Sequence, residues 1–221
     1  MRTEFLYTFI IIFSCIYLQS FSQNSSVRFG LVKYNGGGDW YANPTALPNL
    51  ATFCNDKIKS NIEIEPATVE LASPLIFNYP ILFITGHGNI ILSSEEVYNL
   101  RQYLESGGFL HIDDNYGLDK YIRREMKKVF PNQDFSEVAL SHPVYHQKYE
   151  FDKGLPKIHE HDNKPPQGFG LFIDGRLVCF YTYECDLGDG WEDYSVHKDP
   201  NDLHEAALKM GANIVSYSFS Y

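Results

Sequence analysis

The sequence has few cysteines, no cluster of basic residues and none of the common nucleotide-binding or serine-hydrolase motifs. It carries four cysteines in 221 residues without a CxxC spacing, which excludes a disulfide-stabilised scaffold. The net charge is −10 and the chain has no extended basic run, so we expect no nucleic acid partner. Neither GxSxG nor GxGxxG occurs, and no Lys-Ser/Thr pair follows the glycine triplet at residues 36–38.

The composition is that of a folded globular protein. Hydrophobic residues make up 44% and charged residues 21%, which predicts a buried core rather than a disordered chain. Aromatic residues are abundant, with 16 Tyr and 16 Phe. Tyrosine-rich surfaces often bind ligands, but tyrosine also fills strands, so both interpretations stay open.

The first 22 residues are typical of a signal peptide. A positive charge, an apolar stretch over residues 5–18 and small residues before Gln23 predict cleavage at that point. We therefore expect an exported protein of the periplasm or cell envelope, with residues 23–221 as a single domain. In the alternative interpretation, Cys15 ends a lipoprotein signal, and a lipid anchor associates the protein with the membrane.

Strand-like and helix-like segments alternate between residues 28 and 130. An uninterrupted apolar run at 80–85 is typical of a strand that is buried on both faces of a parallel sheet. Helices are expected to begin at Asn43-Pro44 and at the capping box of Ser93, and to cover residues 118–130. The alternation predicts an α/β fold with a mostly parallel sheet flanked by helices. The expected strands lie at residues 28–34, 62–71, 80–85 and 108–113.

The rest of the chain is less regular. Residues 141–168 are rich in His, Pro and Lys, which predicts a long irregular excursion. Residues 171–180 predict an added β-hairpin with its turn at Asp174-Gly175. We expect a short helix over residues 201–210, closed by the glycine that follows, and a last strand over residues 212–217.

Five motifs follow one another along the chain. They are YNGGGDW at 34–40, TGHG at 85–88, GGFLHIDD at 107–114, DLGDGWE at 186–192 and GANIVSY at 211–217. With these motifs, and over residues 28–219 as a whole, the chain resembles the bacterial domain-of-unknown-function 4159 family. The resemblance implies a sheet similar to the class I glutamine amidotransferase-like or flavodoxin-like fold, and it implies no activity.

The same resemblance permits a test for glutaminase chemistry. Amidotransferases place a nucleophilic cysteine on a sharp turn after a strand, whereas the comparable turns of this chain carry His87 and Asp113. The cysteines of the mature chain fall instead on a helix, in a hairpin and in a loop, at Cys54, Cys179 and Cys185. Glutaminase activity is therefore not expected.

The candidate site is one edge of the predicted sheet. In open α/β sheets, ligands bind beyond the carboxyl ends of the strands. The segments that follow the predicted strands are polar and rich in glycine, and we expect them to converge at this edge. They are residues 35–40, 86–88, 113–117 and 184–191.

Histidines and aspartates of the chain are candidate ligands for a divalent metal, Zn²⁺ or Mn²⁺. Flanking glycines bring His87 to the sheet edge, and Asp113 with Asp114 ends the next strand. His142 is held extended by the proline after it, and with Asp186 it completes the predicted metal set. The alternatives are structural, with His87 fixing its loop and Asp114 capping the next helix.

Three further histidines have weaker patterns. His111 shares a strand face with Asp113, but its position inside the strand is also typical of a core histidine. His159 and His161 have the HxH spacing of an extended metal pair, whereas residues 159–162 as a whole are more typical of a solvated loop.

Two tryptophans lie near carboxylates. Trp40 follows Asp39, and Trp191 lies two residues after Asp189, an arrangement that can hold sugar rings by stacking and hydrogen bonding. The alternative is that both tryptophans fix their loops to the domain. The predicted ligand-binding residues are therefore Asp39, Trp40, His87, Asp113, Asp114 and Trp191.

These observations support two main functional hypotheses. The first is a non-catalytic binding module of the cell envelope, with a glycan or an envelope protein as partner. The alternative is a metal-dependent hydrolase in which His87, Asp113 and either His142 or Asp186 hold an ion that activates water. The alternative requires three of these side chains to share one ion. A third hypothesis, a structural part of a membrane-associated complex, follows from the lipid-anchor interpretation.

Overall fold

The computed structural model describes residues 26–220. The predicted signal peptide and the Cys15 anchor lie outside these residues. Within the described part of the chain, no helix combines the length and the apolar character that a bilayer span requires.

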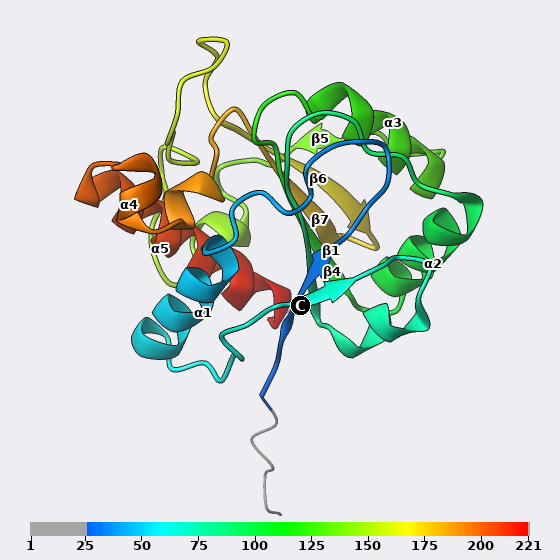
Figure 1. The fold of residues 1–221 in the computed structure, drawn as a ribbon, viewed down its shortest axis with the longest axis horizontal. Helices are drawn as coiled ribbons and strands as arrows, with labels where there is room; N and C mark the ends of the chain where they lie inside the picture. Colours follow the sequence, from blue (N-terminus) through cyan, green and yellow to red (C-terminus); the bar gives the residue numbers. More distant parts are fainter. Residues whose placement is uncertain (1–25, 221) are drawn as a thin grey trace, which may run out of the picture.

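A seven-stranded sheet forms the centre of the molecule, in the order β2-β1-β3-β4-β7-β6-β5 (Figure 1). The pairs from β2 to β7 are parallel, whereas β6 and β5 run antiparallel to their neighbours. This confirms the α/β fold, the mostly parallel sheet and the added β6–β7 hairpin. The strands are β1 Phe29–Val32, β2 Ala67–Val69, β3 Ile81–Ile84, β4 Phe109–Asp113, β5 Ser136–Glu137, β6 Gln167–Ile173 and β7 Arg176–Tyr183.

Helices cover both faces of the sheet. Helices α1 and α5 lie on one face and α2 and α3 on the other (Figure 1). Ile81 and Phe83 of β3 pack with the first pair of helices, and Leu82 and Ile84 with the second, because side chains alternate along a strand. The helices are α1 Ala46–Lys57, α2 Ser94–Glu105, α3 Asp119–Val129, α4 Tyr194–His197 and α5 Asn201–Ser218, with short 3-10 helices η1 Pro74–Asn78, η2 Pro143–Tyr145 and η3 Asp189–Trp191.

The start of one helix is capped by residues close to it in sequence, and the start of another is capped by a distant residue. The predicted capping box of Ser93 and Glu96 is present at the start of α2. Helix α1 begins later than the predicted Asn43-Pro44 start, because Asn43 adopts a left-handed φ of 61°. Thr45 is the N-cap, and both its amide and its hydroxyl donate to the carboxylate of Glu192, at 2.8 and 3.0 Å. A distant loop therefore caps this helix.

Two predicted strands differ from the structure. The prediction of a strand at 212–217 is wrong, because α5 continues through Gly211 to Ser218. Most of its last two turns is buried, so the apolar run lacks the polar face of a surface helix. The strand predicted at 62–71 is reduced to β2, because Pro66 has no amide hydrogen for a ladder bond.

The long excursion is confirmed, and it returns to the sheet. Between residues 146 and 166 the chain has no helix or strand. Asn213 of α5 anchors its first part by accepting hydrogen bonds from the amides of Lys148 and Tyr149, at 2.8 and 2.9 Å. The amide of Ile158 then donates to the carbonyl of Cys185 at 2.9 Å, which brings residues 157–161 to the end of β7.

Candidate functional site

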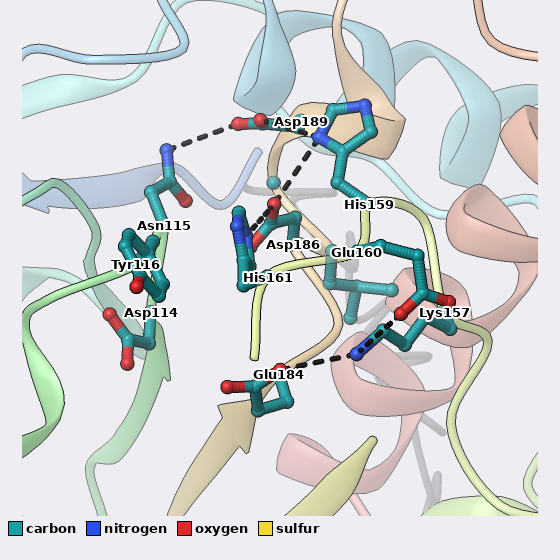
Figure 2. A network of polar contacts seen from close by, with 12 residues as sticks. Asp114, Asn115, Tyr116, Lys157, His159, Glu160, His161, Glu184, Asp186 and Asp189 are labelled. Carbon is teal, nitrogen blue, oxygen red and sulfur yellow. Dashed lines mark hydrogen bonds and ion pairs between the residues drawn. The ribbon is translucent and has the colours of Figure 1, made fainter. Parts of the chain in front are cut away.

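The polar loops that follow the strands converge at one edge of the sheet, as the sequence predicts. Asn43 Nδ2 donates to Asp189 Oδ1 at 2.7 Å. Asn115 Nδ2 lies within hydrogen-bond distance of both the same oxygen, at 3.1 Å, and Asn43 Oδ1, at 2.9 Å. Figure 2 shows Asn115 and Asp189 linked across this edge. Three loops far apart in sequence are therefore joined at the carboxyl ends of the strands.

Asp113, the last residue of β4, holds one of the loops at this edge through hydrogen bonds. It is completely buried, and its carboxylate accepts hydrogen bonds from Thr182 Oγ1 at 2.5 Å and from the amides of Leu187 and Gly188 at 3.2 and 2.6 Å. Burial raises the pKa of Asp113 to about 8. Its acceptor atoms are thus used to hold the loop that carries Asp186 and Asp189.

Asp114 caps a helix, in agreement with the alternative considered for it. Its Oδ1 accepts a hydrogen bond from the amide of Leu118, at 2.8 Å, just before α3. Its Oδ2 accepts from the hydroxyl of Tyr181 at 3.2 Å. Burial raises the pKa of Asp114. The residue also lines the cavity described below.

His87 and Asp39 form a pair on the loops after β3 and β1. Asp39 accepts a hydrogen bond of 2.5 Å from the amide of His87, and its Oδ2 lies 3.0 Å from His87 Nδ1. The side chain of His87 is 54% exposed. This arrangement fixes the loop, as in the structural interpretation of His87, and it leaves part of the ring open to solvent.

The two tryptophans lie in different environments. Trp191 is only 1% exposed, packs against Phe83 and His111, and donates a hydrogen bond from Nε1 to the carbonyl of Ala207 at 2.8 Å. Trp40 is half-buried against the other core of the molecule. The burial of Trp191 matches the interpretation in which the ring fixes its loop to the domain.

His142 lies at the opposite end of the sheet. It caps η2, and its ring contacts Phe172 and Tyr217. Tyr217 packs on Phe109, which is the first residue of β4, whereas Asp113 is the last. The structure therefore does not bring the four residues of the predicted metal set to one ion.

A cluster of histidines and aspartates occupies the edge instead. His159 Nδ1 lies 3.2 Å from Asp186 Oδ2 and 3.1 Å from Asp189 Oδ2. His161 Nε2 contacts the same Asp186 oxygen, and His197 Nε2 lies 3.7 Å from Asp189 Oδ2. We call His159, His161, Asp186, Asp189 and His197 the His–Asp cluster; four of these five residues are labelled in Figure 2.

Asp186 belongs to the metal set that the sequence predicts, whereas the pattern of residues 159–162 is more typical of a solvated loop. The HxH spacing of His159 and His161 was the available signal, and the excursion that carries both residues has no regular pattern from which its path follows. The hydrogen bonds from His159 to Asp186 and Asp189 raise the pKa of the imidazole to about 10. The ring therefore lies between two buried carboxylates, with Nδ1 within hydrogen-bond distance of both.

A cavity of about 460 Å³ lies beside the cluster at the ends of β4 and β7. The ring of Tyr116 connects the two, because it stacks on His161 with 4.6 Å between the ring centroids. The side chains that line the cavity are aromatic, basic or acidic. They are Tyr116, Tyr121 and Tyr183, Lys120 and Lys164, and Asp114, Asp119, Asp162 and Glu184.

The backbone around this edge is strained. Asn43, Tyr116, Glu184 and Asp186 all have positive φ angles, of 61°, 81°, 58° and 52°. Residues other than glycine rarely adopt positive φ angles, because this backbone conformation is strained. Such residues cluster at functional sites, where the surrounding structure maintains the strained conformation. The strain therefore marks the same part of the molecule as the His–Asp cluster and the cavity.

Comparison with protein families assigns the chain to a family. The model of a domain of unknown function (DUF4159) matches residues 28–219. The chain belongs to the DUF4159 family. No curated protein matches this DUF4159 chain.

The motifs of this DUF4159 domain gather at the site. The segments at 34–40, 85–88, 107–114 and 186–192 supply Asp39, His87, Asp113 and the loop of Asp189. The remaining motif, at 211–217, lies in α5 below the edge. Four of the five motifs therefore contribute residues to the carboxyl edge of the sheet.

The described part of the DUF4159 domain has no accessible thiol. Cys54, Cys179 and Cys185 are all buried and free. Burial raises the pKa of Cys54 to about 12, and it raises the pKa values of the other two well above their ordinary range. None of these cysteines lies on the turns after β3 and β4, where His87 and Asp113 lie.

Proposed function

We propose that the protein is an exported, non-catalytic binding module of the cell envelope that takes a glycan in the cavity beside Tyr116. The observation that carries the proposal is the combination of three tyrosines with carboxylates and lysines in one cavity at the carboxyl edge. Aromatic rings pack on the apolar faces of sugars, and charged side chains hydrogen-bond to their hydroxyl groups.

The polar groups of the cavity are held in place by one another. The hydroxyl of Tyr116 donates to Asp162 Oδ1 at 3.0 Å. Lys164 Nζ donates to the hydroxyl of Tyr183 at 2.9 Å and to Asp162 Oδ2 at 3.3 Å. A ligand therefore meets side chains that are already oriented, which lowers the entropy cost of binding.

Binding is favoured over covalent catalysis because the buried thiols have raised pKa values and no cysteine or serine lies on the turns after β3 and β4. The alternative of a metal-dependent hydrolase requires His87, Asp113 and a third predicted ligand to share an ion. Asp113 is enclosed by its hydrogen bonds to Thr182 and the loop amides, and His87 is engaged with Asp39. We therefore do not adopt that alternative with those residues.

Calorimetric titration of the purified chain (residues 23–221) with soluble peptidoglycan fragments, preceded by a glycan array, tests the binding function. Tyr116→Ala removes a ring of the cavity, and Lys164→Ala removes a charged donor, so both variants are expected to weaken binding by at least about tenfold. Tyr98→Ala, at an exposed tyrosine of α2, is the matched control. A wild-type chain that binds no glycan, or equal affinity in all variants, would contradict the proposal.

Export has a separate test, because it depends on residues 1–22 alone. N-terminal analysis of the protein recovered from an envelope fraction is expected to find Gln23 as the first residue. A lipid-modified Cys15 would instead support the lipid-anchored form. An uncleaved chain in the cytoplasmic fraction would contradict export altogether.

A further inference from the structure

The carboxylate of Asp189 is oriented toward two histidines. Its Oδ1 is within hydrogen-bond distance of the side-chain amides of Asn43 and Asn115, at 2.7 and 3.1 Å. Its Oδ2 faces His159 Nδ1 at 3.1 Å and His197 Nε2 at 3.7 Å. One ligand atom from each of the three residues lies within 4.8 Å of the other two.

His159 has a carboxylate on both sides of its ring. While Nδ1 faces Asp189, Nε2 lies 3.2 Å from Asp199 Oδ1. A metal-bound histidine commonly donates its other ring N–H to a carboxylate, which fixes the tautomer and the orientation of the ring. Asp199 is in the position for this role.

Asp186 provides an independent observation that indicates a ligand. The residue is only 1% exposed, and its Oδ2 contacts both His159 and His161 (Figure 2). The other oxygen of the same carboxylate, Oδ1, is buried and has no hydrogen-bond partner among residues 26–220. A buried carboxylate oxygen without a partner is costly, and a cation held by His159, which contacts the other oxygen of the same carboxylate, would offset part of that cost.

The spacing of the cluster suits a tetrahedral ion. With bonds of 2.0–2.1 Å, neighbouring ligand atoms around Zn²⁺ are separated by roughly 3.3 Å. The separations of 3.1 Å between His159 and Asp189 and 3.7 Å between Asp189 and His197 bracket that value. Three protein ligands leave the fourth position of the ion for an exchangeable ligand.

We propose that His159, Asp189 and His197 bind a Zn²⁺ ion, with Asn43, Asn115 and Asp199 orienting two of the ligands. The set of two imidazoles and one carboxylate favours Zn²⁺ over Mn²⁺, because Mn²⁺ has the lowest affinity of the first-row divalent ions for nitrogen ligands and prefers oxygen ligands. This site is distinct from the cavity proposed for a glycan and does not depend on it.

A second cluster in the described chain offers an internal control. His146, Glu150 and Asp152 also place one ligand atom each within 4.8 Å of the others. Both carboxylates of this group are exposed, and no buried oxygen without a partner accompanies them. The two clusters therefore differ in the feature that we take to indicate an ion.

Isothermal titration of the chelator-treated chain (residues 23–221) with ZnCl₂ tests the site. We expect one ion per chain, and a loss of affinity of at least about tenfold in His197→Ala and in Asp189→Asn. His146→Ala is expected to bind Zn²⁺ like the wild type. His197 is the decisive position, because it lies on the four-residue helix α4 and its side chain is 27% exposed, so its removal leaves the core intact.

Three results would overturn the proposal: no Zn²⁺ binding by the wild type, unchanged affinity in a folded His197→Ala variant, or a loss of binding in His146→Ala. Circular dichroism establishes that each variant is folded. Tighter binding of Mn²⁺ than of Zn²⁺ would contradict the choice of metal. Tyr116→Ala is expected to keep its Zn²⁺ affinity, so failure of the metal site and failure of the glycan proposal are distinguishable.

Discussion

At the end of β4, Asp113 accepts hydrogen bonds from Thr182 and from the amides of Leu187 and Gly188. These bonds explain how a carboxylate at a predicted ligand position serves the site by holding the loop of Asp189. The sequence placed Asp113 correctly at the carboxyl edge, but the direction of its carboxylate depends on a strand and a loop about 70 residues away in sequence.

We expect Asp113→Ala to destabilise the domain. The substitution removes the acceptor of the buried amides of Leu187 and Gly188, whereas Thr182 Oγ1 keeps the carbonyl of Ile112 at 3.2 Å. Each buried donor left unpaired costs about 1–3 kcal/mol. Urea unfolding is expected to show a loss of at least about 2 kcal/mol in the free energy of unfolding. Asp152→Ala, at an exposed aspartate, is the control. Equal stabilities of the two variants would show that the bonds of Asp113 do not support the loop.

His111 predicts a dependence of stability on pH. The ring is buried among Phe83, Phe180 and Trp191, and burial lowers its pKa from 6.5 to about 3. Below pH 6.5 the unfolded chain takes up a proton that the folded chain excludes. The stability is therefore fully present above pH 6.5 and decreases by about 1.4 kcal/mol per pH unit as the pH falls toward 3.

The variant His111→Phe isolates this contribution. It keeps an aromatic ring in the core and removes the titrating group, so its free energy of unfolding is expected to decrease less steeply than that of the wild type between pH 6.5 and pH 4.5. Denaturant unfolding at several pH values measures both slopes. Parallel slopes would show that His111 is not the responsible group.

At the scale of elements, the apolar pattern of the sequence predicts those helices and strands whose burial follows a regular repeat. The strands β1, β3 and β4 are predictable because short apolar segments that alternate with helical segments are typical of a parallel sheet. Helix α5 was predicted only in part, because most of its second half is buried, so Ala212 to Tyr217 has the apolar pattern of a strand.

The site shows the same limit. The loops after β1, β3, β4 and β7 were predicted to converge because the carboxyl ends of parallel strands share one edge. His159 and His161 reach that edge through an irregular excursion, whose path is set by bonds from Asn213 and from the carbonyl of Cys185. Such tertiary contacts have no periodic signal in the sequence, so the ligand set could not be assembled from spacing alone.

Gly211 tests the packing of α5. Alanine normally stabilises a helix by about 1 kcal/mol relative to glycine. Here an added Cβ lies 2.5 Å from Leu50 Cδ1 of α1 and 2.9 Å from Trp191 Cζ2. We therefore expect Gly211→Ala to destabilise the domain by about 1–3 kcal/mol, as overpacked cores do.

Thermal unfolding of Gly211→Ala measures this effect. Ser216→Ala, in the next part of the same helix, is the control, since it adds helix propensity and removes a buried hydroxyl that has no partner in the described chain. The control is expected to be neutral or stabilising. A stabilised Gly211→Ala variant would mean that α5 packs less closely on α1 and η3 than the structure shows.

At the scale of the whole molecule, the sheet separates two hydrophobic cores. Cys54 and Cys185 lie in the core beneath α1 and α5, and Cys179 lies in the core beneath α2 and α3. All three thiols are buried and free. The reactivity of these thiols therefore measures the exposure of the core on each side of the sheet.

We expect no thiol of residues 23–221 to react with an aromatic disulfide reagent under native conditions, and all three to react in denaturing guanidinium. At intermediate denaturant concentrations, reaction of Cys54 and Cys179 should rise together, because a single domain with one continuous sheet unfolds cooperatively. Peptide mapping of the labelled chain assigns each site. Reaction of Cys179 at a lower denaturant concentration than Cys54 would show that the α2–α3 side opens independently of the side that carries α5.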